Sequence, residues 1–158
     1  MWKKYKPYII SIAIALAVGG LSALLTKDYM SVYDTINRPA LAPPMWVFPV
    51  VWGILFVLMG ISSAIIYLKR DEDPATAMTA LKIYGGQLIV NFFWTIIFFN
   101  MQAYLFAFIW LLILWVLIIA MIIEFRKISP VAAWLQVPYL LWVTFAGYLT
   151  LMIYLLNR

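Results

Sequence analysis

The sequence has 158 residues, of which 67% are hydrophobic and 11% are charged. A soluble domain carries about 25% charged residues, so this composition excludes an ordinary soluble protein. The chain has no cysteine and no histidine, which removes disulfides, thiolate metal sites and the usual haem ligands. In a chain this apolar, the net charge of +5 indicates membrane topology and not nucleic-acid binding.

Long stretches without charge predict five membrane-spanning helices. Each span requires roughly 20 apolar residues, and the charges cluster between stretches of about that length. The predicted spans cover about residues 8–25, 45–68, 77–99, 104–125 and 130–156. The connection over residues 26–44 is the longest, and it ends at Pro43-Pro44, a pair that suits the start of a helix. We therefore predict one domain over residues 1–158, an all-α membrane protein built as a bundle of five transmembrane helices.

Lysine and arginine lie mostly on one side of these spans, which predicts their orientation. The opposite side carries only Lys27, Arg38 and Arg158. The side of the N-terminus carries the others: Lys3, Lys4, Lys6, Lys69, Arg70, Lys82, Arg126 and Lys127. The count predicts a multi-pass protein of the cell membrane with a cytoplasmic N-terminus and an outward-facing 26–44 loop.

The third predicted span carries one polar and aromatic face. Its members recur at helical spacing: Tyr84, Gln87, Asn91, Trp94 and Phe98. Asn91 lies near the middle of the membrane, where an unpaired amide is costly. Two interpretations stand side by side. The amides hydrogen-bond between helices and hold the bundle together, or they contact a ligand.

Two other spans carry aromatic faces of the same kind. The second span carries Trp52, Phe56, Met59 and Ser63 on one face, and the last span carries Pro138, Trp142, Phe145 and Leu149. Pro138 cannot donate to the carbonyl of Trp134, so the last span should bend there. The three faces together predict an aromatic pocket in which Asn91 orients a flat ligand between Trp52 and Trp142, as ligand pockets are mostly apolar with few placed polar groups. Packing is the alternative interpretation for each tryptophan taken singly.

No acidic or basic side chain lies deep in a predicted span. Ion-coupled pumps keep such a residue in the membrane, so the sequence argues against a small multidrug exporter. We also predict no tight metal site, because histidine and cysteine are absent.

Three segments of the chain together resemble the tryptophan-rich sensory protein / translocator protein family (TspO/MBR). They are Tyr33-Asp34-Thr35-Ile36-Asn37-Arg38-Pro39 with Pro43-Pro44 and Phe48-Pro49-Val50-Val51-Trp52; Asn91-Phe92-Phe93-Trp94; and Ala132-Ala133-Trp134 with Pro138-Tyr139-Leu140-Leu141-Trp142, Phe145-Ala146 and Leu156-Asn157. The chain departs from the family at Val32 and Leu41, where the family usually has tryptophan. If those tryptophans belong to the loop that closes the family's ligand pocket, this loop is altered here.

The resemblance implies a five-helix bundle, often a homodimer, that binds porphyrins and sterol-like or drug-like aromatic molecules. By motif position, Trp52, Asn91, Trp142 and Ala146 would line its pocket. The aromatic faces described above add Pro138, Phe56, Gln87 and Trp94 to the expected ligand-binding residues. Tyr33, Arg38, Pro43 and Pro44 would belong to a lid. The porphyrin would be a ligand and no cofactor is expected. The leading hypothesis is a tetrapyrrole-binding membrane protein acting in transport or stress signalling; the alternatives are an enzyme of light-dependent porphyrin degradation and a small-molecule carrier.

Overall fold

The computed structural model describes residues 2–158 and contains only helices and their connections in that range. The long rods are α1 (Trp2–Thr26), α3 (Val47–Leu68), α4 (Pro74–Thr95), α5 (Tyr104–Ile128) and a final rod divided into α6 (Pro130–Leu135) and α7 (Val137–Asn157). All five rods are long and apolar enough to cross a membrane. The fold class is therefore the predicted one, an all-α bundle of five transmembrane helices.

The helices begin and end at residues whose local chemistry favours a boundary. Asp73 accepts a hydrogen bond from the Thr76 backbone N–H before α4, and Pro74 opens the helix. The contacts with Thr76 hold the pKa of Asp73 below its ordinary value. Ser129 caps Ala132 in the same way before α6. A side-chain oxygen at this position satisfies a backbone donor that the helix leaves free.

The rods start or end a few residues away from the predicted spans. α1 begins at Trp2 and includes the N-terminal lysines, whereas the prediction began at residue 8. α4 passes into a π-helical segment, Ile96–Asn100, and the chain then turns at Gln102, whose φ of 51° is left-handed. The last rod is interrupted at Gln136, and Pro138 lies in the first turn of α7. Proline removes a backbone donor, which is tolerated in a first turn.

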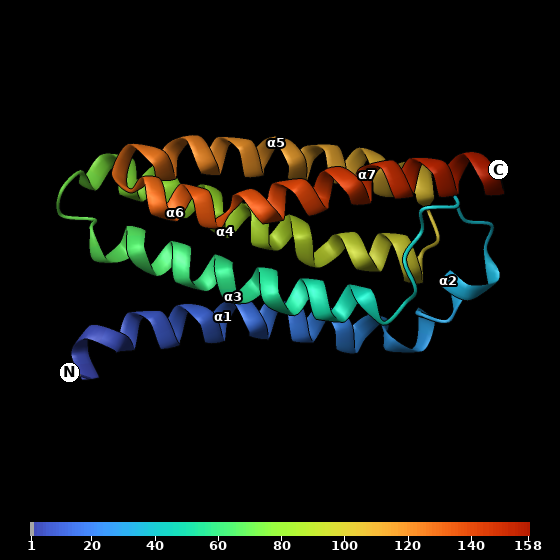
Figure 1. Cartoon of the computed structure of the whole chain (residues 1–158), viewed down its shortest axis with the longest axis horizontal. Coiled ribbons are helices and arrows are strands. Elements are labelled where there is room, and N and C mark those ends of the chain that lie inside the picture. The colour runs from blue at the N-terminus through green and yellow to red at the C-terminus, as the bar shows by residue number, and fades with distance from the viewer. Residues whose placement is uncertain (1) are drawn as a thin grey trace.

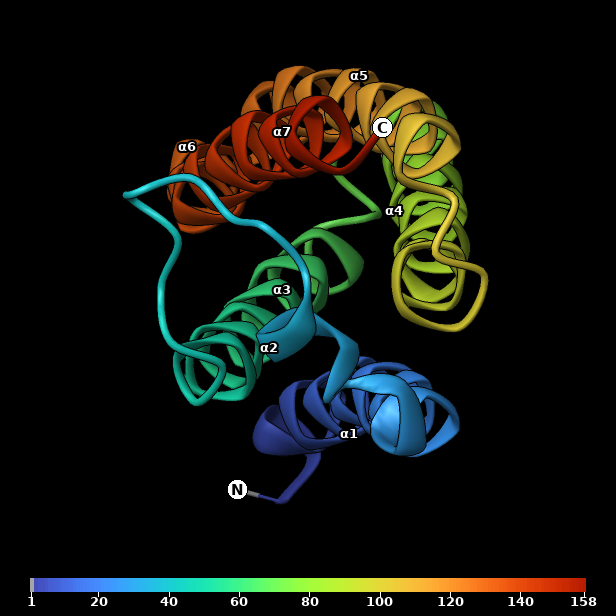
Figure 2. The ribbon, with the colours of Figure 1, turned by 90° about the vertical axis from the view of Figure 1, so that its right-hand side faces the viewer.

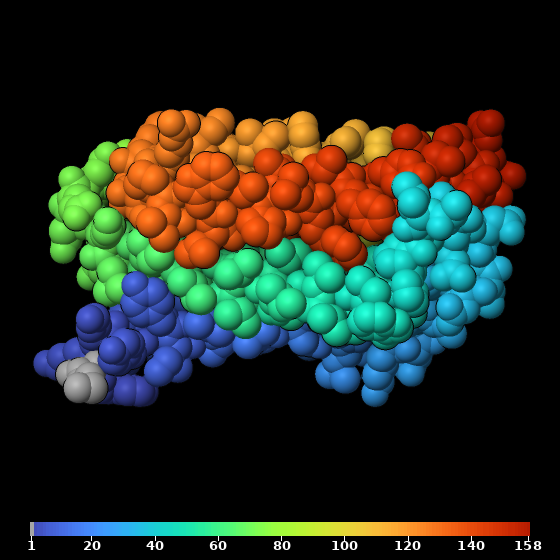
Figure 3. Space-filling view, viewed as in Figure 1, coloured from blue at the N-terminus to red at the C-terminus, as the bar shows by residue number. Residues whose placement is uncertain are grey.

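The rods stand side by side, so that the connections between them lie at the two ends of the bundle (Figure 1). The N-terminus lies at one end of the bundle and the C-terminus at the other, as five spans require. Seen from the C-terminal end, the rods follow one another around the bundle in the order α1, α3, α6/α7, α5 and α4 (Figure 2). The loop that contains α2 (Val32–Thr35) lies across this end and reaches the end of α7 (Figure 3).

Glycine permits the close contact between α1 and α3. A Cβ atom at Gly60 would lie 2.5 Å from the Cα of Ile12, and one at Gly19 would overlap the ring of Phe56. Small residues let membrane helices approach in this way. Beside the contact, the Ser11 and Ser63 hydroxyls share a hydrogen bond of 2.6 Å. α1 is therefore held directly on α3 along much of its length.

Candidate functional site

A cavity of about 90 Å³ lies beneath the α2 loop, between α1, α3, α4 and α7. We call it the lid-end cavity. Its walls are mainly aromatic. Trp52 and Phe56 of α3 stack at 5.7 Å between ring centroids, and Trp94 of α4 lies 5.3 Å from Phe98 of the following π-helical segment, with the rings tilted. Ala146 of α7 forms part of the opposite wall. Aromatic faces of this kind suit a flat apolar ligand.

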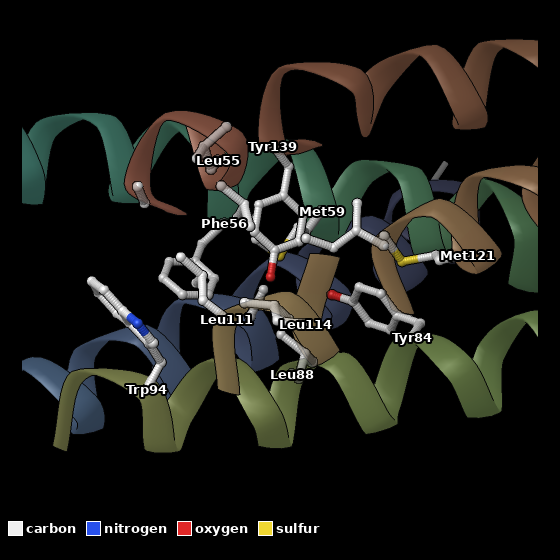
Figure 4. Packing of buried hydrophobic residues seen from close by; sticks show 14 of the residues in the cluster. Leu55, Phe56, Met59, Tyr84, Leu88, Trp94, Leu111, Leu114, Met121 and Tyr139 are labelled. Carbon is white, nitrogen blue, oxygen red and sulfur yellow. The ribbon is translucent and has the colours of Figure 1, made fainter. Parts of the chain in front are cut away.

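One hydrogen-bonded polar group lies deep in this wall. Asn91 donates through Nδ2 to the hydroxyl of Tyr139 at 2.7 Å, and that hydroxyl donates to Oε1 of Gln87 at 2.6 Å. The exposed fractions are 4% for Asn91, 1% for Tyr139 and 0% for Gln87. Nε2 of Gln87 also approaches the sulfur of Met59 at 3.9 Å. Figure 4 shows Tyr139 reaching into the core from α7. The amides therefore do bond between helices, and Asn91 also lines the cavity.

A second polar strip borders the cavity where α1 meets α4. Ser22 shares a short hydrogen bond with Thr95, and Thr26 bonds back to the Ser22 carbonyl at 2.9 Å. Thr150 of α7 bonds to the Ala146 carbonyl at 2.7 Å. All four hydroxyl side chains line the cavity. The described lining contains no charged side chain, so an apolar or neutral polar surface of a ligand matches it best.

The loop between α1 and α3 covers the cavity, and we call it the roof. It is held together through Tyr33. This residue is 1% exposed, and its hydroxyl donates to the Pro43 carbonyl at 2.6 Å. Its ring meets Phe48 edge-on at 5.2 Å, and the Arg38 guanidinium lies 4.4 Å from the ring centroid on the outside. Burial raises the pKa of the Tyr33 hydroxyl above its ordinary value, although Arg38 opposes this. The hydroxyl is therefore a stable donor at neutral pH.

A pair of asparagines fastens the loop to the end of α7. Asn157 accepts a hydrogen bond from the Asn37 backbone N–H at 2.9 Å and donates to the Asn37 carbonyl at 2.8 Å. The Asn37 side chain donates in turn to the Leu156 carbonyl at 3.3 Å. We call this arrangement the Asn37–Asn157 clasp. It joins the loop to the last turn of the last helix, so opening the roof requires breaking it.

The structure brings many of the predicted site residues together. Those that line the lid-end cavity are Trp52, Phe56, Asn91, Trp94, Ala146 and Tyr33. Gln87 lies one layer deeper, bonded to Tyr139. Pro43 supports the roof through its carbonyl, while Pro44 and Arg38 face outward.

Trp142 and Pro138 lie elsewhere, which differs from the predicted common pocket. Both border a shallow groove on the outer side of α3 and α7, together with Val51, Leu141 and Phe145. The inward face of α7 instead carries Tyr139, Val143, Ala146 and Leu149. Trp142 meets Phe48, a lining residue of the cavity, edge-on at 5.8 Å between ring centroids. Pro138, Trp142 and Phe145 each precede an inward-facing residue by one position, which is about 100° around the helix, whereas Leu149 of the predicted face does lie inward.

Sequence reasoning missed Tyr139 as the partner of both amides. Its signal was present, because Tyr139 is spaced by seven residues from Ala146 and therefore lies on the same helical face. The Ser22–Thr95 contact was also missed. Neither hydroxyl belongs to a conspicuous motif, and their proximity depends on how α1 packs against α4.

Comparison with known proteins gives consistent matches over most of the chain. Residues 11–156 match the TspO/MBR family. The tryptophan-rich protein TspO of Chlorobaculum tepidum is 35% identical, covering 99% of this chain and 99% of that protein. The protein CrtK of Rhodobacter capsulatus is 34% identical, covering 79% and 78%. The translocator protein of Ovis aries is 34% identical, covering 74% and 69%.

Proposed function

Because the chain belongs to the TspO/MBR family of multi-pass membrane proteins, we propose that it binds tetrapyrroles and related aromatic or sterol-like ligands in the lid-end cavity. The observation that carries this proposal is the combination of aromatic walls with one placed amide, that of Asn91, beneath a fastened loop. A planar ligand would stack on Trp52 and take a hydrogen bond from Asn91. We place the protein in the cell membrane with a cytoplasmic N-terminus.

The size of the cavity supports a role for loop movement in binding. At about 90 Å³, the cavity is smaller than the roughly 300–1,000 Å³ typical of ligand pockets. A tetrapyrrole therefore requires the roof to move outward. The Asn37–Asn157 clasp and the Tyr33–Pro43 hydrogen bond are the contacts that would break. In this proposal the described position of the loop corresponds to a closed roof.

Charge near the roof suits the acidic side chains of a porphyrin. Arg38 lies over Tyr33, and its ion pair with Asp34 is long at 4.0 Å. A guanidinium binds carboxylates through two parallel hydrogen bonds. When the loop opens, Arg38 can contact a propionate while the ring enters between the aromatic walls. Free porphyrin should bind better than any form that needs strong axial ligation, because the chain has no histidine or cysteine.

Binding alone does not distinguish a sensor, a carrier and a light-dependent enzyme, so the test has three arms. Protoporphyrin is titrated into the purified full-length protein and its absorbance followed in the dark, which should give a saturable shift. The complex is then illuminated; a stable spectrum supports binding without turnover, and bleaching to a new product supports the degrading enzyme. Uptake into sealed vesicles that contain the protein tests the carrier. Absence of a saturable shift in the dark would overturn the proposal.

A further inference from the structure

A second hollow lies at the end of the bundle opposite the loop. This crevice has a volume of about 540 Å³ and lies between the first half of α1, the second half of α3 and the first half of α4. Its walls are mostly apolar and include Pro7, Ile10, Ile14 and Leu81. The volume falls within the range of ligand pockets, roughly 300–1,000 Å³. We call this hollow the N-side crevice.

A closed layer separates the N-side crevice from the lid-end cavity. Both hollows are lined by α1, α3 and α4, and Tyr84 and Asn91 on one face of α4 line the crevice and the cavity respectively. Between them lie Ala15, Met59 and Gln87, each 0% exposed. Gln87 is also hydrogen-bonded to Tyr139. The crevice is therefore a site of its own and does not extend the lid-end cavity.

One cation lines the N-side crevice and a second lies over one of its wall residues. Lys6 lines it directly, and the Arg70 guanidinium lies 4.0 Å from the ring centroid of Tyr67, another lining residue. The ion pairs among residues 2–158 are Arg38–Asp34 and Lys127–Glu124, so neither Lys6 nor Arg70 has a carboxylate within 4.0 Å. An ammonium and a guanidinium together suit a phosphate.

We propose that the N-side crevice binds an anionic phospholipid of the surrounding leaflet. Its phosphate lies between Lys6 and Arg70, and one acyl chain occupies the space between Ile10, Ile14 and Leu81. Charge and apolarity are combined as a phospholipid combines them, with the two cations next to aliphatic walls. Anionic lipid is attracted to interfacial lysine and arginine, which makes this class of lipid the matching occupant.

Native mass spectrometry of the full-length protein tests this site. Equal amounts of 1-palmitoyl-2-oleoyl phosphatidylglycerol and phosphatidylcholine are added, and the ratio of the two one-to-one complexes is measured. Phosphatidylglycerol should dominate, because each cation contributes about fivefold to the preference. Lys6→Gln and Arg70→Gln should each lower the ratio about fivefold. Lys4→Gln is the matched control on the same helix and outside the crevice lining, and it should lower the ratio much less.

A second pair of variants tests the apolar part of the site. Ile14→Trp places a large ring in the crevice at a half-exposed position and should reduce the retained phosphatidylglycerol several-fold. Ile9→Trp, at a similarly exposed position outside the lining, should not. Equal effects of Lys4→Gln and Lys6→Gln, or of the two tryptophan variants, would overturn the proposal by showing diffuse attraction. Displacement of phosphatidylglycerol by protoporphyrin would also overturn it and assign the crevice to the porphyrin.

The phospholipid site does not rest on the proposed tetrapyrrole function. Lys6→Gln should leave protoporphyrin affinity unchanged, because Lys6 lies on the other side of the closed layer. Failure of porphyrin binding in the unsubstituted protein would leave the lipid ratio as the separate test of the crevice.

Discussion

The amide of Asn91 in α4 donates a 2.7 Å hydrogen bond to the hydroxyl of Tyr139 in α7, across the interior of the bundle. That hydroxyl in turn donates a hydrogen bond to Oε1 of Gln87, one helical turn from Asn91. Three polar side chains are thereby satisfied in a region where unpaired polar groups are costly. The same contact fixes the orientation of the one amide that lines the lid-end cavity.

Removal of the Tyr139 hydroxyl should destabilise the bundle. Tyr139→Phe leaves Gln87 and Asn91 without their shared partner, and a buried polar group left unpaired costs about 1–3 kcal/mol. Tyr148→Phe removes a hydroxyl from a residue that is 41% exposed, and it should change stability by less than about 0.5 kcal/mol. Thermal unfolding of the two variants in the same detergent compares them. Equal melting temperatures would show that the buried network contributes nothing measurable.

Loss of the clasp should loosen the roof without unfolding the helices. Asn157→Ala removes both hydrogen bonds between the Asn157 side chain and Asn37, each of which contributes about 0.5–1.5 kcal/mol. Amide hydrogen exchange over residues 36–44 should accelerate by roughly fivefold to a hundredfold. Asn100→Ala is the matched control, since Asn100 bonds to Leu25 at the same end of the bundle. Unchanged exchange in Asn157→Ala would rule out the clasp as the fastening.

The Tyr33 hydroxyl should make the roof sensitive to alkaline pH alone. Its pKa is raised in the folded protein because of burial, so the folded state favours the protonated form. Its stabilising contribution is therefore complete below about pH 10, the ordinary tyrosine pKa, and is lost as pH rises through the raised pKa. The dissociation rate of a bound porphyrin should stay constant from neutral pH and increase only above about pH 10. Tyr33→Phe should remove that increase, whereas Tyr29→Phe, at a half-exposed site, should retain it.

Two glycines of α3 should respond oppositely to the same substitution. Gly60→Ala introduces a Cβ atom 2.5 Å from the Ile12 backbone, which must separate α1 from α3 and should cost about 1–3 kcal/mol. Gly53→Ala meets no heavy atom within 4 Å and should be neutral or stabilise by up to about 1 kcal/mol. Unfolding midpoints of both variants give the comparison. A stable Gly60→Ala protein would contradict the close packing of these helices.

The sequence predicts the bundle well because hydrophobic spans must cross a fixed thickness, and the charged residues mark where they end. It also predicts the inward face of α4, since Tyr84, Gln87, Asn91 and Trp94 share one periodicity and are all buried. It fails on α7, where Trp142 was expected inside and Tyr139 lies there instead. Tryptophan and tyrosine have similar preferences in a membrane, so residue type alone does not reveal which one faces inward.

Affinity for protoporphyrin in a matched pair of tryptophan variants tests the central claim most directly. Trp52→Leu removes an aromatic wall of the lid-end cavity, whereas Trp134→Leu changes a residue that is 72% exposed. Loss of stacking, about 0.5–1.5 kcal/mol, should weaken binding to Trp52→Leu by roughly twofold to tenfold, while Trp134→Leu binds like the unsubstituted protein. Affinity is measured on samples whose thermal unfolding is recorded in parallel. Unchanged affinity in folded Trp52→Leu, or an equal loss in Trp134→Leu, would contradict binding in the lid-end cavity.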